Sequence, residues 1–222
     1  MECHKCKQKN LVSQQFCTYC GTKIEKTPLE HSLNSTSMRD KTRDHLYVNL
    51  LNIGLDCQLA ERGIPEDKLN NPWYLRSLGV ININSDSPIK YVNTIKKDRS
   101  KDSPPKWWHH FAIPLDETIS EDHYLEVKSI RKKTFPIFGK VKSVIWKSVG
   151  KGDGFIKGNR LADEFSVEHE INMLAFKLGN IKIRSLHGSF SGFSIEIDRR
   201  ISINEIQWNA LTQIAKMCLI KK

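Results

Sequence analysis

The sequence has no long apolar run, and this absence limits where the chain can reside. No window holds eighteen consecutive apolar residues, so the sequence predicts no transmembrane segment. The first residues, MECHKCK, lack both an apolar stretch and a small-residue cleavage site, and so do not resemble a secretory signal. We therefore expect a cytoplasmic protein, or a nuclear one if its source is eukaryotic.

Motifs that would indicate a particular enzyme class are also missing. The chain has no G-x-S-x-G turn and no serine–histidine–aspartate signature, and Glu168-His169-Glu170 is not the H-E-x-x-H motif of zinc proteases. Gly150 to Gly154 forms a glycine-rich run whose N–H groups could cradle phosphate, but it lacks the G-K-[ST] ending of a P-loop. We predict a non-enzymatic protein and keep an enzyme that uses the Gly150–Gly154 loop as an alternative.

Acidic residues are too few to balance the basic ones. The 222 residues include 35 Lys and Arg but only 25 Asp and Glu, so the net charge is +10. Such a surplus favours acidic partners such as nucleic acid, an anionic membrane surface or an acidic protein. The stretch from Lys128 to Lys151 contains no acid at all, and a second basic cluster spans 96–106. The candidate phosphate-binding residues in the first stretch are Arg131, Lys132, Lys133, Lys140, Lys142 and Lys147.

These basic residues have two interpretations. Lys140 and Lys142 alternate along a predicted strand and would therefore share one face. If the 131–133 cluster lies on the same face, the residues form a patch that follows a phosphate backbone. The alternative is that they belong to a solvated helix end and loop.

A run of four ring-bearing residues follows the second basic cluster. In a strand, Trp107 and His109 face one way, and Trp108 and His110 face the other. Exposed Trp107 and Trp108 could stack on bases. The alternative is a buried tryptophan beside a histidine at a strand edge.

Cysteine is scarce, but four of the six cysteines fall within the first twenty residues. Cys3, Cys6, Cys17 and Cys20 form two C-x-x-C pairs separated by ten residues, which allows a short hairpin to bring the pairs onto one tetrahedral zinc ion. Two disulfides and redox-active pairs fit less well, since nothing suggests export and no βαβ pattern surrounds the cysteines. Four thiolates leave no open position for water, so we expect one structural Zn²⁺.

This N-terminal stretch resembles the short zinc-ribbon module found at the N-terminus of many prokaryotic proteins. The resemblance rests on Cys3-His4-Lys5-Cys6 and on Phe16-Cys17-Thr18-Tyr19-Cys20-Gly21, with Ile24 as the following aliphatic residue. It implies that the four cysteines are the zinc ligands and that Phe16 packs under the site. Lys7 departs from the pattern, which usually has glycine there. The resemblance covers about 24 residues and implies a metal site without implying a task.

The rest of the chain predicts an α+β fold with a mainly antiparallel sheet. We divide the chain into a zinc ribbon at 1–24, a flexible linker at 25–45 and an α+β domain at 46–222. Cys57 and Cys218 lie among apolar neighbours and are predicted to be core thiols. Predicted helices cover 46–63, 72–79, 118–131, 160–165, 166–179 (capped by Ser166) and 202–218 (capped by Ser202). Predicted strands cover 80–84, 89–95, 107–115, 140–149, 181–188 and 190–198.

Together these features favour a zinc-ribbon protein that binds nucleic acid or a nucleoprotein particle, such as a ribosome or a polymerase, through backbone phosphates. The rival hypothesis is a protein–protein adaptor in which the ribbon docks on a partner. The two differ in salt dependence, because phosphate contacts weaken steeply with ionic strength and an apolar interface does not.

Overall fold

One antiparallel sheet organises the part of the chain that the computed structural model describes, which is residues 5–8, 20, 40–69, 75–115, 124–135, 139–150, 152–186 and 190–220. Eight strands lie in the order β1-β2-β3-β4-β8-β7-β5-β6, and every neighbouring pair is antiparallel. The predicted α+β class with a mainly antiparallel sheet is therefore confirmed. The strands are β1 (Cys57–Leu59), β2 (Arg76–Ile83), β3 (Tyr91–Lys97), β4 (Lys106–Pro114), β5 (Glu126–Lys133), β6 (Val141–Val149), β7 (Ile181–Leu186) and β8 (Gly192–Ile197).

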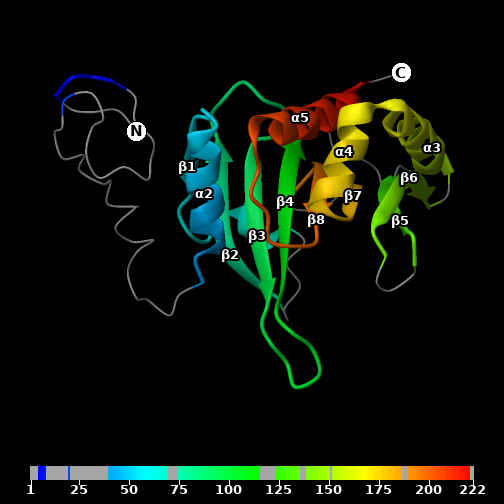
Figure 1. The fold of residues 1–222 in the computed structure, drawn as a ribbon, viewed down its shortest axis with the longest axis horizontal. Helices are drawn as coiled ribbons and strands as arrows, with labels where there is room; N and C mark the ends of the chain where they lie inside the picture. The colour runs from blue at the N-terminus through cyan, green and yellow to red at the C-terminus, as the bar shows by residue number, and fades with distance from the viewer. Residues whose placement is uncertain are drawn as a thin grey trace.

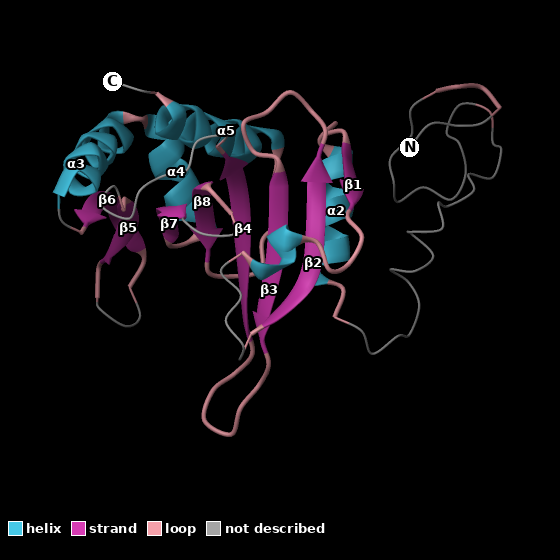
Figure 2. Ribbon diagram, turned by 180° about the vertical axis from the view of Figure 1, so that it is seen from behind, coloured by secondary structure: helices cyan, strands magenta, loops and turns pink. Residues whose placement is uncertain are grey.

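The α-helices lie on one face of this sheet, as Figure 1 shows. From the opposite side, Figure 2 shows the strands in front, with only the short 3₁₀ helix η1 (Pro65–Lys68) lying over β2 and β3. Much of this second face, which we call the open face, carries no helix among the described residues. The helices are α2 (Thr42–Asn52), α3 (Gly152–Val167), α4 (His169–Leu178) and α5 (Glu205–Leu219).

The hydrophobic core lies between the sheet and the helix layer. Phe111 of β4 packs against Trp208 of α5, with ring centroids 6.4 Å apart. Trp146 of β6 meets Phe165 of α3 edge to face at 5.1 Å, and its indole N–H donates to Asn172 of α4. These contacts assign odd-numbered β4 residues to the helix side, and the alternation of a strand then places Trp108 and His110 on the open face.

Several predicted strands are confirmed, but three predicted helices are wrong over the residues that the structure describes. The helix expected over 46–63 ends at Asn52, and Cys57 pairs with Ile83 in β1 instead. Residues 76–79 belong to β2, where Gly79 follows a bulge in the pairing with β3. Residues 126–131 belong to β5, because Val127 and Ser129 are buried alternately with more exposed neighbours. In this segment every second residue is buried, as in a strand, and this pattern outweighs the helix cap expected from the local sequence.

The glycine-rich loop predicted at Gly150–Gly154 is also wrong. Helix α3 already begins at Gly152. Its next turns lie so close to the sheet that a Cβ on Gly158 would be only 2.2 Å from Ser148 Oγ. These small residues therefore allow a helix to pack closely on β6.

The two predicted caps in the C-terminal third are wrong, although their helices are present. Ser166 donates to the Ala162 carbonyl within α3, and α4 begins at His169. Helix α5 is capped by a reciprocal pair, Asn204 and Gln207, two residues beyond the predicted Ser202. Cys57 and Cys218 are buried, as predicted.

The folded domain begins earlier than the predicted boundary at 46. Helix α2 starts at Thr42, and Asp40 is already held against the sheet. The remainder of the predicted linker, 25–39, lies outside the described residues.

Candidate polyanion-binding face

A row of polar residues crosses the open face from strand to strand. His110 of β4 lies opposite Glu196 of β8, which lies opposite Lys182 of β7. Lys182 lies opposite Lys128 of β5, and Lys128 lies opposite Lys147 of β6. The last three positions, Lys182, Lys128 and Lys147, form what we call the lysine row.

The lysine row is poorly neutralised by the acids around it. Glu196 accepts from Arg184 at 2.6 Å, and its other oxygen lies 3.7 Å from Lys182. Among the described residues, no acid lies within ion-pair distance of Lys128 or Lys147. Like charges directly opposite one another in a sheet destabilise it, by roughly 0.2–1 kcal/mol per pair. The row therefore lowers the stability of the isolated sheet and favours a bound polyanion.

A groove of about 1000 Å³ adjoins the lysine row. Its lining residues come from β4, β5 and the ends of the shorter strands β7 and β8, since β8 ends at Ile197 and β7 begins at Ile181. Two tryptophans and six basic residues line it, together with only three acids. The basic residues are Lys106, Lys128, Arg131, Lys182, Arg199 and Arg200, and the acids are Glu126, Glu196 and Asp198.

Hydrogen bonds hold the rim of the groove in place. Arg131 Nε donates to Asn180 Oδ1 at 3.4 Å, and Asn180 Nδ2 donates to Asp198 at 3.4 Å. Burial, with a smaller effect of the nearby Arg199 charge, lowers the pKa of Arg131. Arg199 lies over Gly179, where a Cβ would be 2.4 Å from the guanidinium carbon. Two arginines thus meet at one end of the groove.

The two tryptophans lie on opposite faces of β4, as their alternation predicts. Trp108 is half-buried on the open face and lines the groove. Trp107 turns to the helix side, where its indole N–H donates to Asp40 Oδ2 at 3.1 Å. The Arg200 guanidinium carbon lies 3.7 Å from the Trp107 ring centroid and covers that ring. Trp108 is therefore the better placed of the two for stacking on a base.

Asp40 accepts hydrogen bonds from residues of α2, β3 and β4. Its Oδ2 lies 3.0 Å from Lys96 Nζ and 3.9 Å from Arg200, while Oδ1 accepts from the Thr42 N–H. Burial alone would raise the pKa of Asp40, but the hydrogen bonds from Thr42, Lys96 and Trp107 lower it well below its usual range. A permanently charged Asp40 thus ties the start of α2 to β3 and β4.

The structure brings together only some of the residues predicted from sequence. Trp107, Trp108 and Arg131 line the groove, and Lys147 belongs to the lysine row. Lys132, Lys133, Lys140 and Lys142 are exposed on the β5–β6 hairpin and do not line the groove. Lys140 directly precedes β6, and its carbonyl accepts a hydrogen bond from the Thr134 N–H at 2.9 Å.

Sequence reasoning missed Lys182, Arg199 and Arg200. Lys182 had a detectable signal, because the alternation of IKIR at 181–184 places both cations on one strand face. Arg199 and Arg200 follow the end of β8, and only the spatial neighbourhood of β4 and β5 reveals their place.

His109 and His110 are both buried and are not available for stacking on bases. His109 Nδ1 lies 3.1 Å from Thr94 Oγ1. Burial, with a further effect of the His110 charge, lowers the pKa of His109 to about 3. Burial and the charges of Arg184 and Lys182 lower the pKa of His110 to about 3. Both rings are therefore neutral at pH 7.

The cysteine-rich N-terminus is described only in part. Cys6 is half-buried and Cys20 is exposed, while Cys3 and Cys17 lie outside the described residues. With two of the four predicted ligands described, no group of three or more metal-binding side chains occurs within the described part of the chain. Lys7 has a φ of +59°, the left-handed conformation that glycine provides at this place in zinc ribbons. The backbone after Cys6 thus fits a zinc knuckle despite the departure at Lys7.

Comparisons with protein-family models, with curated proteins and with solved structures found no match. Within the described residues, no helix is long and apolar enough to cross a bilayer. The functional interpretation therefore rests on the geometry and charge of the open face.

Proposed function

We propose that this chain binds nucleic acid, alone or within a nucleoprotein particle, mainly through backbone phosphates, and that it does so without catalysing a reaction. The observation that carries the proposal is the lysine row of Lys182, Lys128 and Lys147. These cations lie directly opposite one another beside a basic groove, an arrangement that lowers the stability of the unbound protein. A bound polyanion removes this repulsion.

The groove next to the row supplies a second type of contact. Trp108 lines it together with Lys128 and Lys182 of the same face, so that an unpaired base can stack on the indole while its phosphates contact the two ammonium groups. Phosphate contacts of this kind position a strand without reading its sequence. The arrangement therefore favours single-stranded nucleic acid with little sequence preference.

We further propose that Cys3, Cys6, Cys17 and Cys20 hold one structural Zn²⁺. The support is the chemistry of four thiolates and the left-handed backbone at Lys7 after the first pair. When bound, the ion would replace the hydrophobic core that so short a segment cannot form by itself. The ribbon would then present a rigid surface beside the nucleic-acid-binding domain.

The test is fluorescence anisotropy of the zinc-loaded chain with a labelled single-stranded RNA and with a duplex DNA over a salt series. We expect binding whose logarithm falls linearly with the logarithm of salt concentration, with a slope of about −0.7 for each phosphate contacted on a single strand. Tighter binding of the single strand supports the role of Trp108. If neither nucleic acid binds at low salt, the proposal is wrong. Binding that does not change with salt would contradict backbone phosphates as the main contact.

A further inference from the structure

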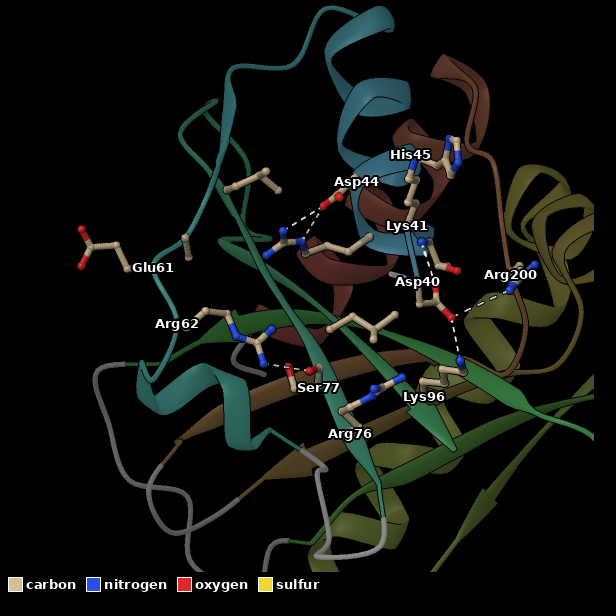
Figure 3. A pocket seen from close by; sticks show the side chains of 15 residues that line it. Asp40, Lys41, Asp44, His45, Glu61, Arg62, Arg76, Ser77, Lys96 and Arg200 are labelled. Atoms are coloured by element: carbon tan, nitrogen blue, oxygen red, sulfur yellow. Dashed lines mark hydrogen bonds and ion pairs between the residues drawn. The ribbon is translucent and has the colours of Figure 1, made fainter. Parts of the chain in front are cut away.

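A second cavity, of about 920 Å³, shares Arg200 with the groove. It is enclosed by the start of α2, the residues that follow β1 and the start of β2, as Figure 3 shows. Six lysines and arginines line it, against three acids. The basic residues are Lys41, Arg43, Arg62, Arg76, Lys96 and Arg200, and the acids are Asp40, Asp44 and Glu61.

Acids in and beside this cavity pair with its cations but do not use all of their N–H donors. Asp44 is buried and accepts two hydrogen bonds from Arg43, at 3.0 and 2.8 Å. Asp40 is occupied by Lys96, Thr42 and Trp107, as described above. Glu61 is exposed, and Figure 3 shows its side chain at the margin, pointing away from the labelled cations. Beyond the lining, Asp67 lies 3.9 Å from Arg62, and Asp98 pairs with Arg76 and Lys96. The hydrogen bonds among the described residues leave Nη1 of both Arg43 and Arg62 available, because Arg43 uses Nε and Nη2 and Arg62 uses Nη2.

Two of the lining arginines converge on Gly79, which follows the lining residues Ser77 and Leu78 in β2. A Cβ on Gly79 would be 2.3 Å from Arg43 Nη1 and 2.8 Å from Arg62 Nη1. Only a residue without a side chain leaves room for both guanidinium groups, and the φ of +111° at Gly79 also favours glycine. The bulge between Ser77 and Gly79 creates this opening in β2. Two like charges are thus held side by side.

We propose that this cavity binds a phosphate monoester group. Guanidinium groups present paired N–H donors that match phosphate oxygens, and two of them balance a dianion better than one. Residues 41–45 at the start of the eleven-residue helix α2 also line the cavity, so its positive dipole end adds to the attraction. The site is separate from the lysine row and does not depend on the proposed backbone contacts. The group is carried either by a small phosphorylated molecule or by the terminal phosphate of a nucleic acid strand.

Calorimetry and thermal melting with inorganic phosphate and with adenosine 5′-monophosphate test the proposal, with chloride at equal ionic strength as the reference. Arg62→Gln is the informative variant, because Arg62 is largely exposed and the substitution should not prevent folding. We expect it to weaken phosphate binding about tenfold. Arg62→Lys keeps the charge but loses the paired donors. Its affinity for phosphate should lie between that of the wild type and that of Arg62→Gln. Lys177→Gln on the exposed surface of α4 is the matched control and should bind as the wild type does.

Oligonucleotides with and without a 5′-phosphate distinguish the two sources. If the strand end is the ligand, the phosphorylated oligonucleotide binds more tightly and Arg62→Gln removes the difference. If a small molecule is the ligand, inorganic phosphate and the monophosphate bind while the two oligonucleotides behave alike. The proposal is wrong if phosphate has no more effect than chloride, or if Arg62→Gln and Lys177→Gln bind phosphate equally. Neither result affects the proposed role of the lysine row, which Lys128 substitutions test separately.

Discussion

At the scale of single residues, the buried pair His109 and His110 should make the fold sensitive to acid. Both have a pKa of about 3 in the folded state, against 6.5 when exposed. Unfolding therefore takes up protons between these values, and the free energy of unfolding falls as pH decreases from 6.5 toward 3, by up to about 1.4 kcal/mol per pH unit for each histidine. Chemical denaturation between pH 7 and 4.5 measures this slope.

His109→Gln should reduce the pH slope by about half, because one of the two buried rings is removed. His169→Gln is the control, since His169 is exposed on α4. Equal slopes in the wild type and in His109→Gln would show that other groups control the acid response.

Substitutions of the two adjacent tryptophans should have different effects, one on stability and the other on binding. Trp107→Phe loses the hydrogen bond to Asp40 and should lower the free energy of unfolding by about 2 kcal/mol, as expected for a bond to a charged acceptor. Trp108→Ala should leave most of the stability and weaken single-strand binding by about 1–3 kcal/mol. Denaturation and anisotropy on both variants measure the two effects. The assignment fails if Trp107→Phe alone reduces binding.

At the scale of secondary-structure elements, removing a cation from the lysine row should raise the stability of the protein and weaken its binding to RNA. Lys128 lies opposite both Lys147 and Lys182. Lys128→Gln should therefore raise the melting temperature at low salt, by the equivalent of roughly 0.2–1 kcal/mol per relieved pair, and weaken RNA binding. Lys142→Gln on the same hairpin, at the irregularity in the pairing of β5 with β6, is the control. A loss of stability in Lys128→Gln would contradict the proposed repulsion.

The proposed zinc ribbon and the sheet should behave as separate elements. The described hydrophobic core draws only on residues from Leu46 onward. Chelation should therefore remove one zinc ion per chain and leave the main melting transition unchanged, because zinc binding and ribbon folding are coupled only to each other. Elemental analysis and calorimetry check both points. Cys6→Ser should reduce the zinc content, and a full zinc content in that variant would exclude Cys6 as a ligand.

The sequence predicts strands better than it predicts helix boundaries, and for a physical reason. In KVKSVIWKSV and IKIRSL, alternation follows the burial of one strand face. The helix expected over 118–131 came from a cap spacing alone, and pairing with β6 and β7 determines β5 instead. Gly150–Gly154 was expected to be a loop, because no local feature reveals that α3 already begins at Gly152.

The candidate site was predictable only where its residues are close in sequence. Trp108, Arg131 and Lys147 come from runs that are conspicuous in the sequence, and each lies in the groove or the lysine row. Arg199 and Arg200 follow the end of β8, and the chain order does not reveal that β8 lies between β4 and β7. The convergence of Arg43 and Arg62 on Gly79 likewise depends on α2 and the residues after β1 meeting at one bulge.

At the scale of the whole molecule, positive charge gathers on particular surfaces. The open face, its groove and the adjoining cavity all carry more basic than acidic residues, and both hollows include Arg200. Clustered charge of this kind attracts a polyanion from a distance and speeds its association. Nucleic-acid binding through the open face is the central claim of this account.

The most direct test replaces three lysines of the open face and three elsewhere, and compares their salt slopes for single-stranded RNA. The first variant combines Lys128→Gln, Lys147→Gln and Lys182→Gln. The second removes the same charge with Lys90→Gln, Lys177→Gln and Lys216→Gln. We predict that the first variant binds weakly and that its slope is smaller in magnitude by about 2, near 0.7 for each lost contact, while the second behaves as the wild type. Equal slopes in all three proteins would contradict the assignment of the open face as the binding surface.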